Sequence, residues 1–213
     1  MTIRDMVARH SDFDDTKDFA PTPPFATRAL YHYVAPDLAA AAPLLTAWDP
    51  AAGHGHMCRV MAEYDHLSVR GTDIVPSEEH GVEGLDFLKS TDKADVIITN
   101  PPYTLLNEFI VQGLERANSA FAVLVRVQAL EGQSRYRNFY SVCPPSKIAY
   151  FSDRIPFKMG KVVRKAPKMF FHVWLYWEIP QVRYRKEAPQ WVPSMWIPPN
   201  VQTLLEKGED YGN

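Results

Sequence analysis

Residues 94–103 read ADVIITNPPY, and this stretch decides the fold because a buried strand ends there in a rigid corner. The run 94–100 has the continuous apolar character of a strand that is covered on both faces. Two prolines follow Asn100, and each proline fixes its own φ and restricts the residue before it. The stretch therefore predicts a strand of a parallel sheet with a loop of fixed shape at its carboxyl end.

Similar apolar runs lie on both sides of this strand and alternate with segments of helical spacing. Further strands are predicted at 44–48, 67–74, 120–127, 146–151 and 169–179, and helices at 25–34, 56–64 and 105–117. The alternation up to residue 150 favours an α/β fold with a doubly wound, mostly parallel sheet. The last two strands lack a helix-length spacer, which predicts an antiparallel ending.

The loop after the first strand reads WDPAAGHGHM (48–57) and has the composition of a ligand-binding turn. Gly53 and Gly55 let the backbone turn sharply and approach a ligand closely. Asp49 stands at the carboxyl end of the strand, where open α/β sheets bind their ligands. A strand-to-helix turn also needs glycine for its geometry alone, so this motif is weak when taken by itself.

Two further acids follow strands or turns in the same half of the chain. Asp73, in RGTDI (70–74), is about 20 residues beyond the glycines and is placed to bind two ribose hydroxyls. The alternative is a helix cap. In GLDFLKS (84–90), Asp86 can accept from an exocyclic amine and Phe87 can lie against a purine face. An isolated Asp-Phe pair carries little information.

The residues NPPY (100–103) indicate a specific chemistry. The prolines hold the Asn100 side chain and the Pro101 carbonyl in a fixed relation, and both are oxygen acceptors. Together they can accept the two hydrogens of a planar amino group, which frees the nitrogen lone pair for attack. Tyr103 supplies a stacking face. A plain Asn-Pro turn is the structural alternative.

In this order the four motifs resemble those of class I S-adenosylmethionine-dependent methyltransferases, and NPPY is most like that of compact, phage-type DNA adenine-N6 methyltransferases. The resemblance covers about residues 19–178. It implies a Rossmann-like, seven-stranded sheet with an antiparallel final hairpin, S-adenosyl-L-methionine as cofactor, and methyl transfer to a flipped adenine in DNA. It implies cofactor contacts by Thr22, Phe25, Asp49, Ala51, Gly53, Gly55, Asp73, Ile74, Asp86 and Phe87, and a catalytic loop of Asn100, Pro101, Pro102 and Tyr103.

Other substrates and another class of protein stay open at this point. The same chemistry would suit adenine in RNA, cytosine N4 or a protein glutamine. A non-catalytic nucleic-acid-binding or decoy protein could also have kept the fold.

Positive charge is concentrated in one part of the chain, although the net charge is only −2. Residues 126–168 contain ten lysines and arginines but only two acids, Glu131 and Asp153. Such a segment suits a polyanion such as DNA, or RNA as the alternative, and a solvated basic face is the simpler explanation. Residues 153–174 are interpreted as a basic hairpin arm. Phosphate contacts are predicted for Arg135, Arg137, Lys158, Lys161, Arg164, Lys165 and Lys168.

The length of 213 residues suits a single methyltransferase domain, 1–213, without a separate target-recognition domain. Residues 1–18 are expected to be a flexible N-terminal segment, and 187–213 a tail rich in proline and tryptophan. The oligomeric state is not predicted.

The sequence also excludes several classes of protein. No apolar run approaches the roughly 18 residues of a membrane span, and the charged start does not suit a signal peptide. Cys58 and Cys143 cannot form a disulfide framework, so a reduced, cytoplasmic setting is expected. The stretch HGHMC (54–58) crowds its ligands into a helix start, so no metal site is predicted.

Overall fold

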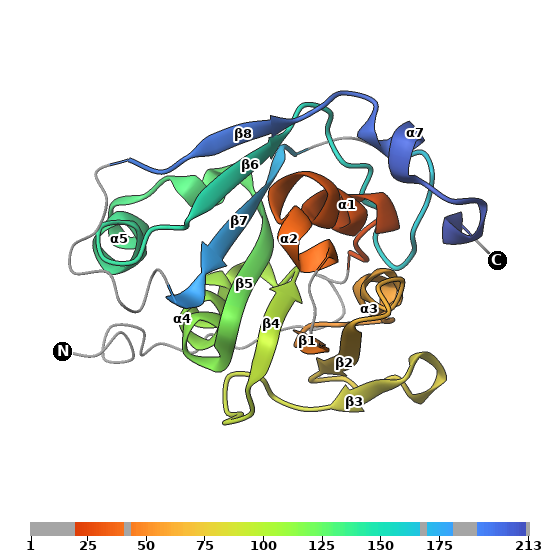
Figure 1. Cartoon of the computed structure of the whole chain (residues 1–213), viewed down its shortest axis with the longest axis horizontal. Helices are drawn as coiled ribbons and strands as arrows, with labels where there is room; N and C mark the ends of the chain where they lie inside the picture. Colours follow the sequence, from red (N-terminus) through yellow and green to blue (C-terminus); the bar gives the residue numbers. More distant parts are fainter. Residues whose placement is uncertain (1–19, 41–43, 167–169, 181–190, 212–213) are drawn as a thin grey trace.

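A computed structural model of the chain describes residues 20–40, 44–166, 170–180 and 191–211. These residues form one eight-stranded sheet with strand order β3-β2-β1-β4-β5-β7-β6-β8 (Figure 1). The strands are β1 (Leu45–Asp49), β2 (Leu67–Asp73), β3 (Val82–Gly84), β4 (Ala94–Thr99), β5 (Ala117–Arg126), β6 (Lys147–Phe151), β7 (His172–Glu178) and β8 (Ser194–Ile197). The expected N-terminal segment 1–18 lies outside the described residues.

The pairing of the strands confirms the predicted α/β class. β1 pairs in parallel with β2 and β4, and the parallel part of the sheet continues to β3 on one side and β5 on the other. β7 is antiparallel to both β5 and β6. The sheet has one strand more than the seven expected, because part of the tail 187–213 forms β8 and pairs in parallel with β6.

Helices cover both faces of the sheet. The α-helices are α1 (Pro24–Ala29), α2 (Pro36–Ala39), α3 (His56–Met61), α4 (Leu106–Arg116), α5 (Gln133–Arg135) and α7 (Val201–Leu205), and a π-helix, Leu30–Val34, follows α1. One core cluster contains residues of α1 and α3, and the other contains residues of α4 (Figure 1). Within the described ranges, no helix has the length and apolar character needed to cross a bilayer.

β4 shows why the apolar run at 94–99 forms a central strand. Successive side chains of a strand point to opposite faces of the sheet. Val96 and Ile98 accordingly belong to the core under α1 and α3, whereas Ile97 belongs to the core under α4. All three are almost fully buried. The absence of alternation in the sequence therefore reflects burial of both faces, as predicted.

The connection between β6 and β7 differs from the predicted basic hairpin arm. β6 and β7 do pair as an antiparallel hairpin, but the described part of the connection, 152–166 and 170–171, contains no strand. The described part of the connection is instead irregular. Pro156 would interrupt a strand ladder there, since proline has no N–H to donate and fixes φ.

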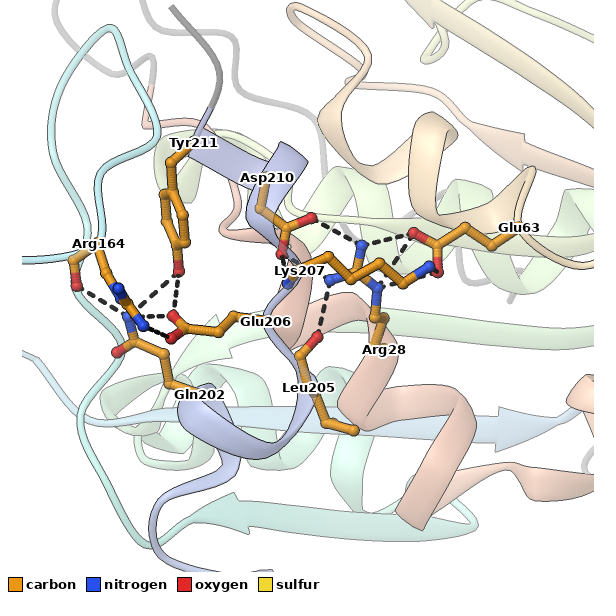
Figure 2. Close-up of polar contacts among 9 residues, drawn as sticks. All are labelled: Arg28, Glu63, Arg164, Gln202, Leu205, Glu206, Lys207, Asp210 and Tyr211. Atoms are coloured by element: carbon orange, nitrogen blue, oxygen red, sulfur yellow. Dashed lines mark hydrogen bonds and ion pairs between the residues drawn. The ribbon is translucent and has the colours of Figure 1, made fainter.

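A C-terminal segment, residues 201–211, attaches to the start of the fold through a network of ion pairs (Figure 2). Arg28 of α1 is only 7% exposed and binds Glu63 at 2.6 Å and Asp210 at 2.7 Å. The Arg28 guanidinium also donates to the Leu205 carbonyl at 2.8 Å. Lys207 contacts the same Glu63 carboxylate at 2.8 Å. One buried cation therefore joins three segments that are far apart in sequence.

A second contact ties the same C-terminal segment to the β6–β7 connection. Arg164 forms an ion pair with Glu206, and the Gln202 amide donates to the Arg164 carbonyl at 2.8 Å. The Tyr211 hydroxyl donates to Glu206 at 2.9 Å. The C-terminal segment thus holds both α1 and the described part of the basic connection (Figure 2).

Asp210→Ala should lower the free energy of unfolding by about 3 kcal/mol, because it leaves a buried guanidinium with fewer acceptors. Asp92→Ala is the matched control, since its ion pair with Arg70 joins side chains that are 47% and 38% exposed. Exposed pairs contribute about 0–1 kcal/mol. Urea unfolding of both variants gives the comparison. Equal losses would show that burial does not strengthen the Arg28 network.

Candidate functional site

A cavity of about 330 Å³ lies at the carboxyl ends of β1, β2 and β4. Parallel strands place their carboxyl ends at the same edge of a sheet, and ligands of open α/β sheets bind there. Nine of the residues singled out in the sequence line this cavity. They are Thr22, Asp49, Ala51, Gly53, Asp73, Asn100, Pro101, Pro102 and Tyr103.

Hydrogen bonds between the first two loops fix one wall of the cavity. The Gly53 N–H donates to Asp73 Oδ2 at 2.8 Å, and the Val75 N–H donates to Asp73 Oδ1 at 3.1 Å. Gly53 has a φ of 53°, a left-handed conformation that glycine adopts without strain. The Asp73 carboxylate is therefore held in place by backbone donors and keeps lone pairs for a ligand.

Asp49 is the most deeply buried acid of the cavity. It is 1% exposed, and the Ala51 N–H donates to its Oδ1 at 3.2 Å. Burial raises the pKa of the Asp49 carboxyl to about 7, and the nearby Asp73 charge acts in the same direction. Within the described residues no cation forms an ion pair with Asp49. This carboxyl therefore titrates near neutral pH.

The Asn100 side chain is anchored to the segment before α1. Its Nδ2 donates to Thr22 Oγ1 at 3.0 Å and lies 3.5 Å from the Ala20 carbonyl oxygen. Because the amide nitrogen is occupied in this way, the amide oxygen is the atom left for a ligand. The rigid corner predicted at 100–102 is thus reinforced by a contact from a segment about 80 residues away in the sequence.

Tyr103 has charged and polar neighbours from the antiparallel part of the sheet. Its hydroxyl lies 3.2 Å from His172 Nε2. The Arg126 guanidinium lies over the Tyr103 ring, with its Cζ 4.2 Å from the ring centroid. His172 is 3% exposed, and burial lowers its pKa to about 4, so the imidazole is neutral at pH 7.

Five predicted cofactor residues do not line the cavity. Phe25 is 2% exposed in the core, and Ile74 points to the surface at 59% exposure. Gly55 precedes α3 with a φ of 68°, so it serves the turn. Asp86 forms an ion pair with Lys89, and Phe87 is packed between Trp48 and Phe109 in the core below α4. The sequence pattern alone did not reveal these packing partners.

Other residues of the cavity escaped the sequence analysis. They are Ala20, Pro21, Ala52, His54, Met57, Val75, Pro76 and Ser77. Most are neighbours of residues that were predicted, so extending each motif by two or three positions would have found them. His54 was considered only as a metal ligand. Across the described ranges, no three His, Cys, Asp or Glu side chains are grouped so as to hold a metal ion.

The predicted phosphate-binding residues have mixed surroundings. Arg164 is paired with Glu206, and Arg135 donates to the Gln128 and Glu131 carbonyls and to Asn107. These two arginines therefore have structural partners. Arg137 is exposed, and its guanidinium donates a long hydrogen bond to the Gln133 side-chain oxygen at 3.4 Å. Lys158, Lys161 and Lys165 lie in the β6–β7 connection, and Lys168 lies outside the described residues.

Lys161 also lines a second, larger cavity of about 1060 Å³. This cavity is bordered by the β6–β7 connection, α3 and the C-terminal segment. His54 lines both cavities, so they are neighbours.

Comparison with known proteins identifies solved structures that share the fold of this chain. No protein-family model and no curated protein sequence matches the chain. The structure is similar to that of a Listeria monocytogenes protein assigned to the class I S-adenosylmethionine-dependent methyltransferases, with 13% identity and a TM-score of 0.61. The match covers 92% of this chain and 71% of that chain.

Two further solved structures have the same arrangement. One is a Pyrococcus horikoshii protein assigned as an RNA methyltransferase, with 12% identity, a TM-score of 0.51, and coverage of 79% of this chain and 91% of that chain. The other is a dimethyladenosine transferase from Plasmodium falciparum, with 12% identity, a TM-score of 0.51, and coverage of 79% and 66%. Identities this low establish a shared fold.

Asp49→Asn should remove a pH-dependent loss of stability. A carboxyl whose pKa is raised in the folded protein contributes stability at low pH, and that contribution is lost as pH rises through the folded pKa. For Asp49 the loss falls between about pH 4 and pH 7 and is on the order of 4 kcal/mol. The Asn variant should therefore gain stability over the wild type between about pH 5 and pH 8 in urea unfolding.

Asp65→Asn is the control, because Asp65 is exposed. Parallel stability curves for the wild type and Asp49→Asn would mean that Asp49 stays ionised throughout this range.

Proposed function

We propose that the protein transfers a methyl group from S-adenosylmethionine to the exocyclic N6 amine of adenine in DNA. The observation that carries the proposal is one cavity that joins two sets of groups. Gly53 and Asp73 belong to the first set, and Asn100, Pro101 and Tyr103 to the second. A methyltransferase needs a cofactor site and an amine site within reach of each other.

The residues present fit S-adenosylmethionine in charge and shape. The anchored Asp73 carboxylate would accept hydrogen bonds from ribose hydroxyls, and Gly53 lets the backbone approach the ligand closely. Asp49 is a buried acid without a described ion-pair partner, and a cationic ligand favours its ionised form. When bound, S-adenosylmethionine supplies an electrophilic methyl group on a positively charged sulfur.

Asn100 and Pro101 would orient the amine. The Asn100 amide oxygen and the Pro101 carbonyl accept the two amine hydrogens, so the nitrogen lone pair is directed at the methyl group. Thr22 keeps the Asn100 amide in the required orientation through its 3.0 Å hydrogen bond. No general base has to deprotonate the amine before the attack.

DNA is the proposed substrate for two reasons. Its bases carry the planar amine that the proposed chemistry requires, and its phosphates suit the lysines of the β6–β7 connection. A base inside a duplex is out of reach, so the target nucleotide would be flipped out and stacked on Tyr103. Lys158, Lys161 and Lys165 would contact phosphates without reading sequence.

Adenine in RNA is the second candidate. It is suggested by the names of two proteins whose structures share this fold. One is assigned as an RNA methyltransferase and the other is a dimethyladenosine transferase. Cytosine N4 and protein glutamine are further outcomes of the experiment below. A non-catalytic protein would show no binding of S-adenosylmethionine.

The experiment incubates the protein and S-adenosylmethionine with DNA, RNA and a glutamine-containing peptide in parallel. Mass spectrometry of the digested products identifies the methylated group. N6-methyladenine in DNA supports the proposal. Modification confined to cytosine, RNA or the peptide would reassign the substrate, and no modification of any of them would contradict methyl transfer.

Asn100→Ala should reduce the rate of methyl transfer by about 10²–10³, because a positioned acceptor of the amine is lost. Affinity for S-adenosylmethionine should change by no more than a few-fold, as roughly expected for a residue that contacts the amine. Steady-state kinetics and calorimetry measure the two quantities. Asn138→Ala is the control, because Asn138 is half-buried like Asn100 but does not line the cavity. Near-normal turnover of Asn100→Ala would exclude the assigned role.

Asp73→Ala should weaken the binding of S-adenosylmethionine about tenfold or more, since hydrogen bonds to a charged group contribute about 1.5–3 kcal/mol. Asp73→Asn separates charge from anchoring, because the amide oxygen can still accept from the Gly53 N–H. Calorimetry should rank the affinities as wild type, then Asn, then Ala. An unchanged dissociation constant in both variants would reduce Asp73 to a loop anchor.

A further inference from the structure

The guanidinium of Arg126 lies between two aromatic rings. Its Cζ is 4.2 Å from the centroid of Tyr103 and 3.9 Å from the centroid of Phe170. Both distances are well within the range of about 6 Å for cation–π contact. Arg126 is the last residue of β5 and pairs in register with His172 of β7. A flat cation therefore covers one face of the Tyr103 ring at the edge of the cavity.

Tyr103 is also the ring on which the proposed function stacks the target base. A guanidinium and a nucleic-acid base are both planar and both stack on aromatic faces. We propose that Arg126 is a displaceable plug, whose guanidinium holds the stacking position on Tyr103 until the target base takes it. This inference rests on the proposed function and adds a residue that sets how readily a base is inserted.

In this position the Arg126 side chain does not make all the hydrogen bonds that it can donate. The Nε atom is buried and finds no hydrogen-bond partner among the described residues. An unpaired buried donor is unfavourable and opposes the two ring contacts. The stack is thus held by weak contacts and is opposed by an unmet hydrogen bond.

Insertion of a base frees the guanidinium. The base replaces the guanidinium on the Tyr103 ring, and the released side chain reaches water, which can accept hydrogen bonds from its N–H groups. The Nε donor that is unpaired at rest can then be satisfied. Insertion of the base and release of Arg126 are therefore two parts of one step, and no covalent bond changes in it.

The test measures methyl transfer to a single-stranded oligonucleotide rich in adenine, so that base pairing does not limit insertion. Arg126→Ala should lower KM roughly three- to tenfold with little change in kcat, because one competitor for the ring is removed. Arg126→Lys keeps the charge but loses the planar face, so KM should fall in the same direction by less. This second variant also keeps the test valid if Arg126→Ala folds poorly.

Arg154→Ala is the matched control, since the Arg154 guanidinium lies over the ring of Phe171, which follows Phe170 in the sequence, with its Cζ 4.3 Å from the ring centroid. Loss of a positive charge ordinarily weakens binding to a polyanion, so Arg154→Ala should leave KM unchanged or raise it slightly. A higher KM for both Arg126 variants would overturn the plug and make Arg126 a phosphate contact. An inactive wild type would instead overturn the proposed function, and the plug with it.

Discussion

The parallel pairing of β1 with β2 and β4 is the constraint on which the cavity depends. It brings Asp49, Asp73 and Asn100 to one edge of the sheet, although they lie at the carboxyl ends of three different strands. A shift of β4 by one residue would exchange Val96 and Ile98 with Ile97 between two different cores. The burial of the apolar side chains therefore fixes the register of the strands, and the register fixes where the polar side chains of the cavity lie.

Some groups that are expensive to bury lie beside this edge, and others, such as Tyr31 and Arg116, lie elsewhere. The Asp49 carboxyl is buried with a raised pKa, and Arg126 Nε lacks a partner in the described residues. Buried polar atoms in folded proteins are normally paired, so each exception calls for an explanation, and a functional role is one of them. The rest of the molecule compensates through large buried side chains. Trp174 and Trp177 are fully covered, and their indole N–H groups donate to the Ala26 and Cys143 carbonyls.

The features that could be predicted from the sequence are those that depend on residues close together in the chain. The start of β4 and the place of Asp73 at the end of β2 follow from a few neighbouring residues, and both positions were predicted correctly; the end of β4 lies at Thr99, one residue before the predicted end. The burial of Phe87 depends on Trp48 and Phe109, which no local pattern connects to it. Arg164 was predicted to face phosphates, but its partner Glu206 is 42 residues away. β8 is too short to be recognised, since four residues carry almost no periodicity.

The Arg28 network has a consequence for how the chain is made. Arg28 and Asp210 are separated by 182 residues, and at about 5–20 residues per second this corresponds to roughly 10–40 s of synthesis. During that interval the Arg28 guanidinium has Glu63 but lacks its more buried partner Asp210, so the apolar burial of α1 has to offset an incompletely paired charge. Thr22 precedes α1, so its hydrogen bond with Asn100 also depends on how firmly α1 is held on the sheet. The half of the molecule that carries the cavity is thus synthesised early but gains its full ion-pair network only after Asp210 has been made.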